Sequence, residues 1–436
     1  MTRILVRAHK SPFRVASVEE TRQRNLIGDN TGNLVFSQSV FRLLSTSGTQ
    51  IDAARFVRDN ADAINEGYDH VVIPLANAFR VSFANRLDLM SDIIEKLTIP
   101  VSIVGVGAQA SLKGGFRKAD GMTPQVTRFV RACLDRSPSI GVRGEFTADF
   151  LKGLGFGADH VDVIGCPSMF MYGPDLHVEK KVDALDADSR LAFNVSPYVQ
   201  KTGPLSLHHA QAYRNLVYMA QDHLTLELME TGTFPEVKQT WIDNGVPVYL
   251  DHPLVTQDRV RFFVDPRTWF DHLAGYDFSF GTRIHGNIAA LLAGTPALVL
   301  AHDSRTLELA DYHQIPRKAV SELKPDTDAA ELYAACDWEP MNRGHQAKWD
   351  TFQQFLARHD LAHVYAEGQD ASAFDARLAA LELPPPVRTL MGAPPADLYA
   401  MKNELAALRG SADPTRRVSV RSLAAAAGRR LRRDPA

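Results

Sequence analysis

The feature that most constrains the fold is a regular alternation of buried strands with amphipathic helices. In the first part of the chain, five apolar segments read as strands that end in small or polar residues: Thr2–Ala8, Tyr68–Asn77, Pro100–Ala110, Ser139–Arg143 and Val161–Gly165. Segments with helical spacing of apolar residues separate them, such as Leu34–Leu44. Such alternation indicates a parallel sheet covered on both faces, and these sheets bind ligands beyond the carboxyl ends of their strands.

A second α/β pattern begins after a polar segment, Pro174 to Arg190, which we interpret as a linker. Its predicted elements are a strand, a long helix, two strands and a helix: Leu191–Ser196, around Ala210–Thr231, Pro247–Asp251, Val260–Val264 and Thr268–Tyr276. From about Ser321 onward the spacing of apolar residues is helical.

The length of the chain also favours more than one domain, because 436 residues exceed what one compact core usually holds. We predict an α/β fold with two Rossmann-like parallel-sheet domains, residues 1–180 and 181–320, followed by a helical extension over residues 321–436. The end of this extension is rich in arginine: Arg416, Arg417, Arg421, Arg429, Arg430, Arg432 and Arg433.

The composition points to a globular protein of a reducing compartment. The chain is 45% hydrophobic and 23% charged, and its net charge of −3 gives no reason to expect nucleic acid as a partner. The beginning of the sequence has no signal-peptide core, and no run of about 18 apolar residues occurs. We therefore expect a cytoplasmic protein, either free or held at the inner face of the membrane.

Neither a disulfide framework nor a metal site is expected. The three cysteines, Cys133, Cys166 and Cys336, are far apart and odd in number. His208 and His209 are adjacent, and neighbouring residues on a helix point in different directions, so we do not expect them to share a metal ion.

The most informative motif lies in the segment Tyr276–Leu300, YDFSFGTRIHGNIAALLAGTPALVL, which reads as strand, turn, helix and strand. The turn holds Arg283 and His285 and is flanked by Gly281 and Gly286. An arginine and a histidine in a turn are often surface groups or satisfied core groups. Here the glycines allow a ligand to approach the backbone closely, which favours a binding role.

The chemistry of this turn suits an anion. A helix N-terminus offers unpaired N–H groups and a partial positive charge, and an arginine adds a fork that matches carboxylate or phosphate. Because a protonated histidine is unfavourable at a helix N-terminus, we expect His285 to be neutral until an anion binds. A neutral imidazole can accept a proton from a hydroxyl group.

Several motifs resemble those of the polysaccharide pyruvyl transferase family. The segment FGTRIHGNIAALLAGTPALVLAHDSRTLEL resembles the family's C-terminal signature, and VSIVGVGAQ, SIGVRGEFTADFLKGLGF and VDVIGCPSMF resemble its N-terminal half in the same order. The segment GDNTGNLVF looks like a variant of the family's early Asn-Gly-Asp loop, with Gly32 and Asn33 where Gly-Asp is often found. The resemblance covers roughly residues 25 to 320.

This resemblance implies a GT-B-like arrangement of the two domains, with the site between them. It implies transfer of pyruvate from phosphoenolpyruvate to sugar hydroxyls, with no cofactor and no metal. Carried over to this sequence, Arg283 and His285 are the catalytic candidates, and the donor-binding candidates are Arg143 and the segment Arg283, Ile284, His285 and Gly286. The expected acceptor is a saccharide of a bacterial surface polysaccharide, either free or carried by a lipid.

Other polar residues at strand ends are candidates for the same cleft: Asn33, Gln109, Asn194, Ser196, Thr282, Asp303, Ser304 and Arg305. Each has a simpler alternative. Asp303 or Ser304 could only cap the following helix, and Gln109 could only belong to a turn.

Two other functions remain open from the sequence alone. A GT-B glycosyltransferase that uses a nucleotide sugar would also bind phosphates with arginine and a helix N-terminus. A non-catalytic member of a polysaccharide assembly complex would keep the fold without the chemistry. The arginine-rich end is either a disordered basic tail or a contact with anionic lipid.

Overall fold

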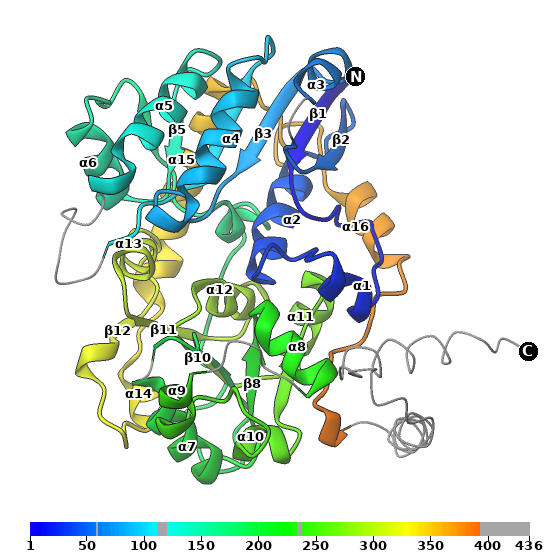
Figure 1. Cartoon of the computed structure of the whole chain (residues 1–436). Coiled ribbons are helices and arrows are strands. Elements are labelled where there is room, and N and C mark those ends of the chain that lie inside the picture. Colours follow the sequence, from blue (N-terminus) through cyan, green and yellow to red (C-terminus); the bar gives the residue numbers. More distant parts are fainter. Residues whose placement is uncertain (58–59, 111–119, 200, 233–237, 393–436) are drawn as a thin grey trace, which may run out of the picture.

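The computed structural model describes residues 1–57, 60–110, 120–199, 201–232 and 238–392. Within them the chain forms two six-stranded sheets, one in each lobe of the molecule (Figure 1). The first sheet has the order β2-β1-β3-β4-β5-β6, and all its strand pairs are parallel: β1 (Thr2–Arg7), β2 (Thr49–Ala54), β3 (His70–Pro74), β4 (Val101–Val106), β5 (Ile140–Val142) and β6 (Val161–Val163). The strand order reverses between β1 and β3, and such a reversal opens a crevice for ligands.

Helices cover both faces of the first sheet. Ile4 and Val6 of β1 belong to one hydrophobic core, while Leu5 between them belongs to another. The first core is completed by α2 (Gly32–Leu44), α15 (Glu339–Arg358) and α16 (Ser372–Ala379). The second is completed by α3 (Ala61–Gly67), α4 (Ala84–Ile94), α5 (Thr123–Leu134) and α6 (Glu145–Gly153). Burial of alternate side chains on opposite faces explains the nearly continuous apolar runs in the sequence.

The second sheet is also parallel and has the order β12-β11-β10-β7-β8-β9. Its strands are β7 (Leu191–Asn194), β8 (Leu216–Ala220), β9 (Val260–Phe262), β10 (Phe278–Gly281), β11 (Ala297–Ala301) and β12 (Arg317–Ala319). The helices of this part are α7 (Thr202–Ala212), α8 (His223–Thr231), α9 (Gln239–Asp243), α10 (Pro253–Thr256), α11 (Pro266–Leu273), α12 (Ile284–Leu292), α13 (Ser304–His313) and α14 (Ala329–Ala335). This is the strand order of a Rossmann fold, with its reversal between β7 and β10. The predicted fold class, two Rossmann-like domains in a GT-B-like arrangement, is confirmed.

Two predicted elements of the second domain are wrong. The segment from Ala210 to Thr231 is not one long helix, because β8 interrupts it and lies between β7 and β9 in the sheet. The segment Pro247–Asp251 is not a strand; Val246 and Val248 instead pack against Leu228 of α8 in a small separate cluster. The helix prediction failed because β8 is buried within the sheet. The strand prediction failed because the apolar residues of that segment are buried by a local contact instead.

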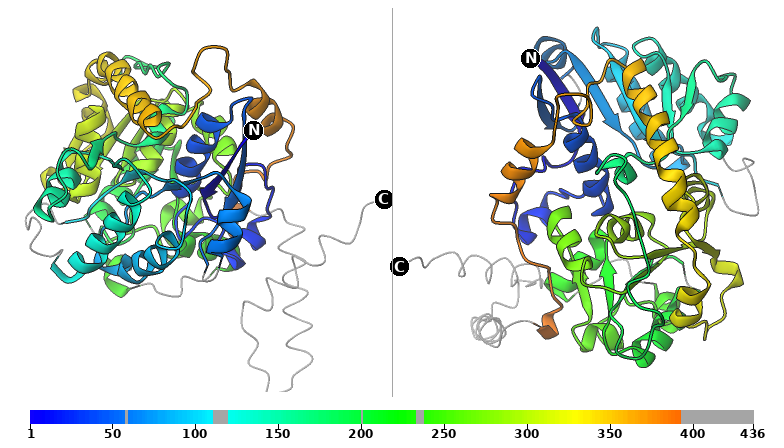
Figure 2. Two further views of the ribbon diagram at one scale, coloured as in Figure 1. Left: turned by 90° about the horizontal axis from the view of Figure 1, so that it is seen from above. Right: turned by 180° about the vertical axis from the view of Figure 1, so that it is seen from behind.

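The helices after residue 320 belong to both domains. Tyr333 of α14 lies in the core of the second domain, whereas Trp349, Phe352 and Phe355 of α15 lie in the core of the first. Seen from behind, α15 is the long helix that runs from the lower lobe to the upper one (Figure 2). The predicted extension is therefore part of the fold as far as it is described. Its arginine-rich end lies outside the described residues, and the domain boundaries near 180 and 320 stay predictions.

The remaining described helices are α1 (Val18–Gln23) and four short 3-10 helices with a few residues each: Val81–Phe83, Pro167–Phe170, Val320–Glu322 and Leu390–Gly392. A further 3-10 turn precedes α5 at Asp120–Met122. Among the helices in the described ranges, none combines the length and the hydropathy needed to cross a bilayer.

Candidate active site

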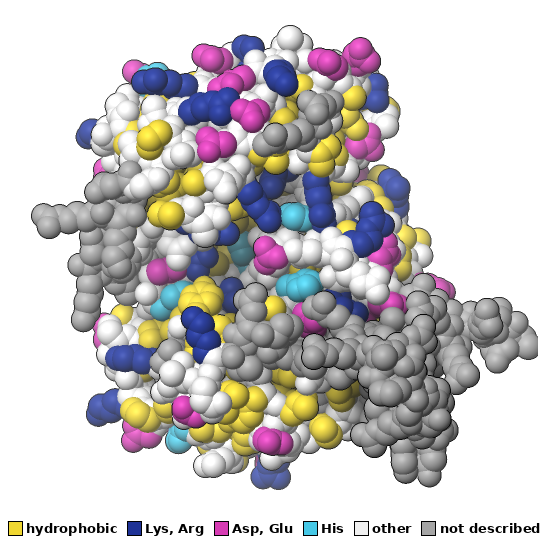
Figure 3. All heavy atoms as spheres, viewed as in Figure 1, with side chains coloured by type: hydrophobic (Ala, Val, Ile, Leu, Met, Phe, Trp, Pro, Cys, Tyr) yellow, Lys and Arg dark blue, Asp and Glu magenta, His cyan; other side chains and the backbone are white. Residues whose placement is uncertain are grey.

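A cavity of about 600 Å³ lies between the two domains, at the carboxyl ends of both sheets. Figure 3 shows basic side chains and histidines gathered in the hollow between the two lobes. The charges that line the cavity are mostly positive, with six arginines and two aspartates: Arg7, Arg80, Arg86, Arg143, Arg283, Arg305, Asp29 and Asp222. A cavity with this excess of fixed positive charge suits an anionic ligand.

The turn between β10 and α12 is held in place by Asn194, the last residue of β7. The Asn194 side-chain oxygen accepts a hydrogen bond from the Arg283 backbone N–H at 3.0 Å, and its carbonyl accepts one from the Thr282 N–H at 2.7 Å. A side chain at Gly281 would place its Cβ 1.6 Å from the Asn194 carbonyl oxygen, so only glycine fits there. The two strands at the sheet's reversal point thus fix the position of α12.

His285 lies in the first turn of α12 and is 9% exposed. Its Nε2 atom is 3.7 Å from Sγ of Cys166, and its ring meets the edge of Phe36 at a centroid distance of 5.7 Å. Burial, followed by the positive charges of Arg143 and Arg305, lowers the pKa of His285 to about 3. At neutral pH the imidazole of His285 is therefore neutral, as the sequence predicts.

Arg283 forms an ion pair with Asp222, and its guanidinium lies 5.6 Å from the centre of the Tyr198 ring. Burial would lower the pKa of Arg283, but the carboxylate of Asp222 outweighs it and raises the pKa above its ordinary value. The Nε atom of Arg283 is buried without a hydrogen-bond partner among the described residues. Asp222 thus fixes one edge of the Arg283 guanidinium, whereas its Nε–H group has no partner among the described residues.

Arg143 follows β5 and is 1% exposed. Its side chain passes directly over Gly107, where an added Cβ would lie 2.4 Å from Nε. Among the described residues, its guanidinium makes one long hydrogen bond, from Nη2 to the Gly105 carbonyl at 3.4 Å, and Nε has no partner. Burial lowers the pKa of Arg143, so a charged ligand would relieve an unfavourable state.

Arg305 completes this group from the first turn of α13. It pairs with Asp303 at 3.0 Å, and Asp303 also caps α13 by accepting a hydrogen bond from Thr306 N–H at 3.0 Å. Gln109 of the first domain donates to the same carboxylate at 3.2 Å. Ser304 contacts the first domain as well, since its hydroxyl accepts from Ala110 N–H at 2.9 Å.

Eight of the predicted cleft residues line the cavity: Asn33, Gln109, Arg143, Thr282, Arg283, Ile284, His285 and Arg305. The other five are not among the lining residues and lie next to them: Asn194, Ser196, Gly286, Asp303 and Ser304. They hold the wall together, for example through the 2.8 Å bond from Ser196 N–H to the Thr282 hydroxyl. For Asp303, the alternative of a helix cap is the one that the geometry supports.

The loop before α2 crosses from the first domain to the second. Thr31 N–H donates to the Gln221 carbonyl at 3.0 Å, and the Thr31 hydroxyl donates to the Phe263 carbonyl at 2.6 Å. Gly32 packs against His285, because a Cβ at Gly32 would lie 2.7 Å from the His285 Cβ. Gly32 therefore allows the start of α2 to approach the start of α12.

Thirteen charged or polar residues that line the cavity were not predicted from the sequence, and they include Arg7, His9, Arg80, Arg86, Tyr198, Gln221 and Asp222. Gln221 and Asp222 directly follow β8, which the sequence analysis placed inside a helix. Arg7 and His9 come at the end of β1, and Arg80 and Arg86 follow β3. The rule that ligands bind beyond strand ends could have identified all four.

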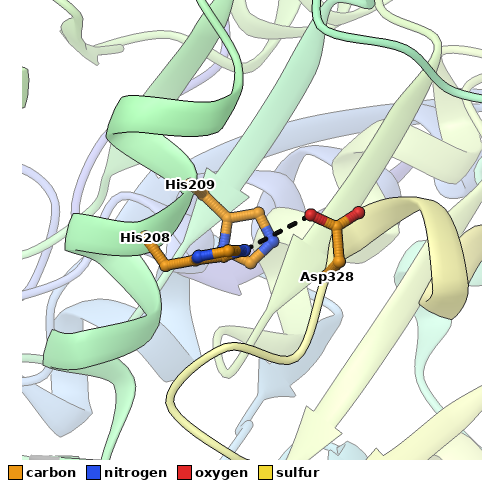
Figure 4. Close-up of side chains that lie close together, drawn as sticks. All are labelled: His208, His209 and Asp328. Carbon is orange, nitrogen blue, oxygen red and sulfur yellow. Dashed lines mark hydrogen bonds and ion pairs between the residues drawn. The ribbon is translucent and has the colours of Figure 1, made fainter.

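His208 and His209 of α7 do not point apart as expected (Figure 4). Their rings are 5.1 Å apart, and His208 Nε2 lies 3.3 Å from Oδ2 of Asp328, which caps α14. One ligand atom from each of the three residues lies within 4.8 Å of the others. His209 donates from Nδ1–H to the Leu205 carbonyl, 2.7 Å away. This cluster joins α7 to α14 and is not part of the cavity.

The fold and the site define a two-domain α/β protein with a GT-B-like arrangement and an arginine-lined cleft between its domains. A family model described as polysaccharide pyruvyl transferase matches residues 30–304. The chain belongs to the polysaccharide pyruvyl transferase family. A search of curated proteins by sequence found no match.

Solved structures with a similar fold include two proteins that bind uridine nucleotides. UDP-GlcNAc 2-epimerase from Neisseria meningitidis, bound to UDP-GlcNAc, is 11% identical with a TM-score of 0.42, and the alignment covers 82% of this chain and 100% of that one. Anabaena Alr3699/HepE in complex with UDP and glucose is 11% identical with a TM-score of 0.40, covering 87% and 98%. At such low identity and TM-score, these likenesses say nothing about what this chain binds.

Proposed function

We propose that this protein transfers pyruvate from phosphoenolpyruvate to two hydroxyls of a saccharide of a bacterial surface polysaccharide, or of its precursor, and forms a cyclic ketal. The observation that carries the proposal is a neutral, buried His285 at the start of α12, beside Arg143, Arg283 and Arg305. Three arginines and a helix N-terminus match a small molecule that bears both a carboxylate and a phosphate.

Donor binding in this proposal uses residues of both domains. Arg283 and Arg305 come from the second domain, each already oriented by a carboxylate, and Arg143 comes from the first. The Nε atoms of Arg143, Arg283 and Arg305 are buried without a hydrogen-bond partner among the described residues, so these three cations are incompletely compensated by the protein. Binding a trianion among them would offset their charge and draw the two domains together around the ligand.

The proposed chemistry needs one proton donor and one proton acceptor. Protonation of the methylene carbon of phosphoenolpyruvate makes C2 electrophilic, and a sugar hydroxyl then attacks C2 and loses its proton. The C2–O bond to phosphate breaks, inorganic phosphate leaves, and a second hydroxyl attacks C2 to close the ketal. His285 can carry protons in these steps, and such a positioned group contributes about 10²–10⁴-fold to the rate.

The charge of the donor would change the acid–base state of His285. Burial and the charges of Arg143 and Arg305 lower its pKa to about 3, which makes the imidazole a very weak base. A bound trianion offsets those positive charges, so the pKa of His285 rises toward its ordinary value. In this way the imidazole becomes an effective proton carrier only when the donor is present.

Calorimetry with phosphoenolpyruvate tests the proposal directly. We expect the wild type to bind one donor molecule per chain and Arg283→Gln to lose this binding, while Arg131→Gln, an exposed change on α5, leaves it intact. No binding to the wild type, with or without a saccharide extract, contradicts the proposal. Binding of a uridine nucleotide sugar in place of phosphoenolpyruvate supports the glycosyltransferase alternative instead.

We also propose that the arginine-rich end, which includes Arg429, Arg430, Arg432 and Arg433, contacts anionic lipid near a lipid-carried acceptor. Each basic residue near such a surface contributes about 1 kcal/mol. Flotation with anionic vesicles compares the wild type with a variant in which these four residues are glutamine. Equal recovery of both proteins with the vesicles contradicts this contact.

A further inference from the structure

The six arginines of the cavity separate into two groups by their position in the fold. The first group, Arg143, Arg283 and Arg305, surrounds His285, and we call it the donor group. The second group, Arg7, Arg80 and Arg86, belongs entirely to the first domain. Arg7 ends β1, and the other two follow β3, so this second group lies where the strand order of the first sheet reverses.

The second group is held in place by the protein but not neutralised by it. The guanidiniums of Arg80 and Arg86 lie 5.2 and 5.7 Å from the centre of the Phe83 ring. Arg80 also donates from Nε to the Ser82 hydroxyl at 3.1 Å. Among the described residues, no carboxylate forms an ion pair with any member of the group, whereas Arg283 and Arg305 of the donor group are both paired.

Neighbouring cations add to the positive charge of the second group. Burial, followed by the charges of Arg86 and Arg55, lowers the pKa of Arg7 to about 10. Arg55 lies in an adjoining groove of about 300 Å³ that shares Ala8 and His9 with the main cavity. The Nδ1 atom of His9 is buried there without a hydrogen-bond partner in the described ranges. An arrangement of fixed, uncompensated cations is costly unless a ligand supplies negative charge.

The donor does not account for this second group. The carboxylate and phosphate of phosphoenolpyruvate provide anions for the three arginines around His285, the residue expected to move protons. The second group lines the same cavity from the first domain, on the side where the cavity shares Ala8 and His9 with the adjoining groove. The acceptor must enter this cavity as well, since its hydroxyls have to reach the carbon next to the donor phosphate.

We propose that Arg7, Arg80 and Arg86 form a second anion subsite, which binds a phosphate or carboxylate carried by the acceptor saccharide. The acceptor is thus an anionic saccharide rather than a neutral one, and its charged group positions the hydroxyls toward the donor. This assignment of the acceptor rests on the proposed function. The subsite itself is defined by the three arginines, of which Arg7 lies outside the residues matched by the family model.

Calorimetry on the full chain, preloaded with phosphoenolpyruvate, tests the subsite with two probes. Inorganic pyrophosphate represents a phosphate-bearing acceptor, and glucuronate represents an acidic sugar. We expect at least one of them to bind once per chain and to bind about 10-fold more weakly, or ~1.4 kcal/mol, in Arg7→Gln and in Arg86→Gln. The probe that binds identifies the charged group, and Arg131→Gln is the matched control.

Three outcomes overturn the subsite. They are no binding of either probe to the preloaded wild type, equal affinity in all variants, and loss of phosphoenolpyruvate binding in Arg7→Gln or Arg86→Gln, which would assign these arginines to the donor. Thermal melts show whether each variant is folded, and the exposed position of Arg86 makes its substitution the safer one. If phosphoenolpyruvate fails to bind but pyrophosphate binding still depends on Arg7 and Arg86, the proposed function falls and the anion subsite stands.

Discussion

The two walls of the cleft contain the same kind of side chain in opposite electrostatic conditions. In the second domain, Arg283 and Arg305 each have a carboxylate partner, and the pKa of both guanidiniums is raised although burial alone would lower it. In the first domain, Arg7 and Arg80 have no such partner among the described residues, and burial lowers the pKa of both.

This difference implies two roles: paired arginines orient a bound ligand, and unpaired arginines attract it. A paired arginine is held in one geometry and loses little freedom when a ligand binds, so it suits the positioning of a reacting molecule. An unpaired arginine contributes a stronger positive potential but destabilises the folded protein, and binding of an anion relieves that cost. We therefore expect the paired Arg283 and Arg305 of the second domain to control chemistry, and the unpaired Arg7 and Arg80 of the first domain to control which acceptor is attracted.

The largest effect is expected for His285→Gln, which keeps the polar contact but removes the proton carrier. Phosphate release from phosphoenolpyruvate with a saccharide extract should fall about 10²–10⁴-fold, while calorimetric affinity for the donor changes little. Because the donor's charge raises the pKa of His285 from about 3, the wild type should take up protons on binding it in mildly acidic buffer. Calorimetry in buffers of different ionisation enthalpy measures this uptake, and equal uptake by His285→Gln contradicts the role.

Opposite changes in stability should distinguish the two walls. Arg283→Gln leaves the Asp222 carboxylate in the wall without its ion partner, so the free energy of unfolding should fall by ~2 kcal/mol. Arg7→Gln removes repulsion from Arg86 and Arg55, so the same quantity should rise by ~0.5 kcal/mol. Urea unfolding of both variants gives the two values. Destabilisation of the same size by both substitutions would remove the contrast between the walls.

The sequence predicts a site residue when the neighbouring residues in the chain are enough to define the strand or helix that positions it. The turn with Arg283 and His285 follows one strand and starts one helix, so its position was predictable from its neighbours in the chain. Arg143 was predictable for the same reason, since it directly follows β5. The partner of Arg283 was not found, because Asp222 follows a strand that reads like the middle of an amphipathic helix.

The remaining parts depend on contacts between distant segments. The group formed by Arg7, Arg80 and Arg86 can be recognised only once the first sheet is known to reverse its order between β1 and β3. Likewise, the aromatic face of α15 predicts a buried helix but not that it fills the core of the domain at the other end of the chain. The strand order and the packing of α15 against the first domain depend on how the hydrophobic cores of both domains pack together, not on any single segment.

A smaller effect is expected for Gly107→Ala, which tests whether the position of Arg143 matters as well as its charge. The new Cβ would lie 2.4 Å from Arg143 Nε, so the guanidinium must move. Affinity for phosphoenolpyruvate should fall about 10-fold, because a misplaced charge cannot form a bidentate contact. The control is Gly153→Ala on α6, where an added Cβ meets no atom within 4 Å. Unchanged affinity in Gly107→Ala would show that Arg143 contributes only its positive charge and not a precisely placed contact.

The smallest effect concerns the junction between the walls, where Glu308 of α13 accepts hydrogen bonds from the backbone N–H of Thr147 at 2.7 Å and from its hydroxyl at 3.0 Å. Burial raises the pKa of Glu308 from its ordinary value of 4.5 to about 7. The folded protein thus binds more protons than the unfolded chain between these values, and this residue's contribution to stability falls as pH rises from 4.5 to about 7. It stays low above that range.

Glu308→Gln replaces the carboxyl group with a neutral amide of the same shape, so this part of the pH dependence should disappear. The variant should match the wild type near the acid end of the window and exceed it above neutral pH, by on the order of 1 kcal/mol. Thermal melts of both proteins across the window provide the comparison. If the two melting profiles run parallel throughout, Glu308 stays ionised at the junction, and the two walls are joined by a charged contact rather than by a neutral one.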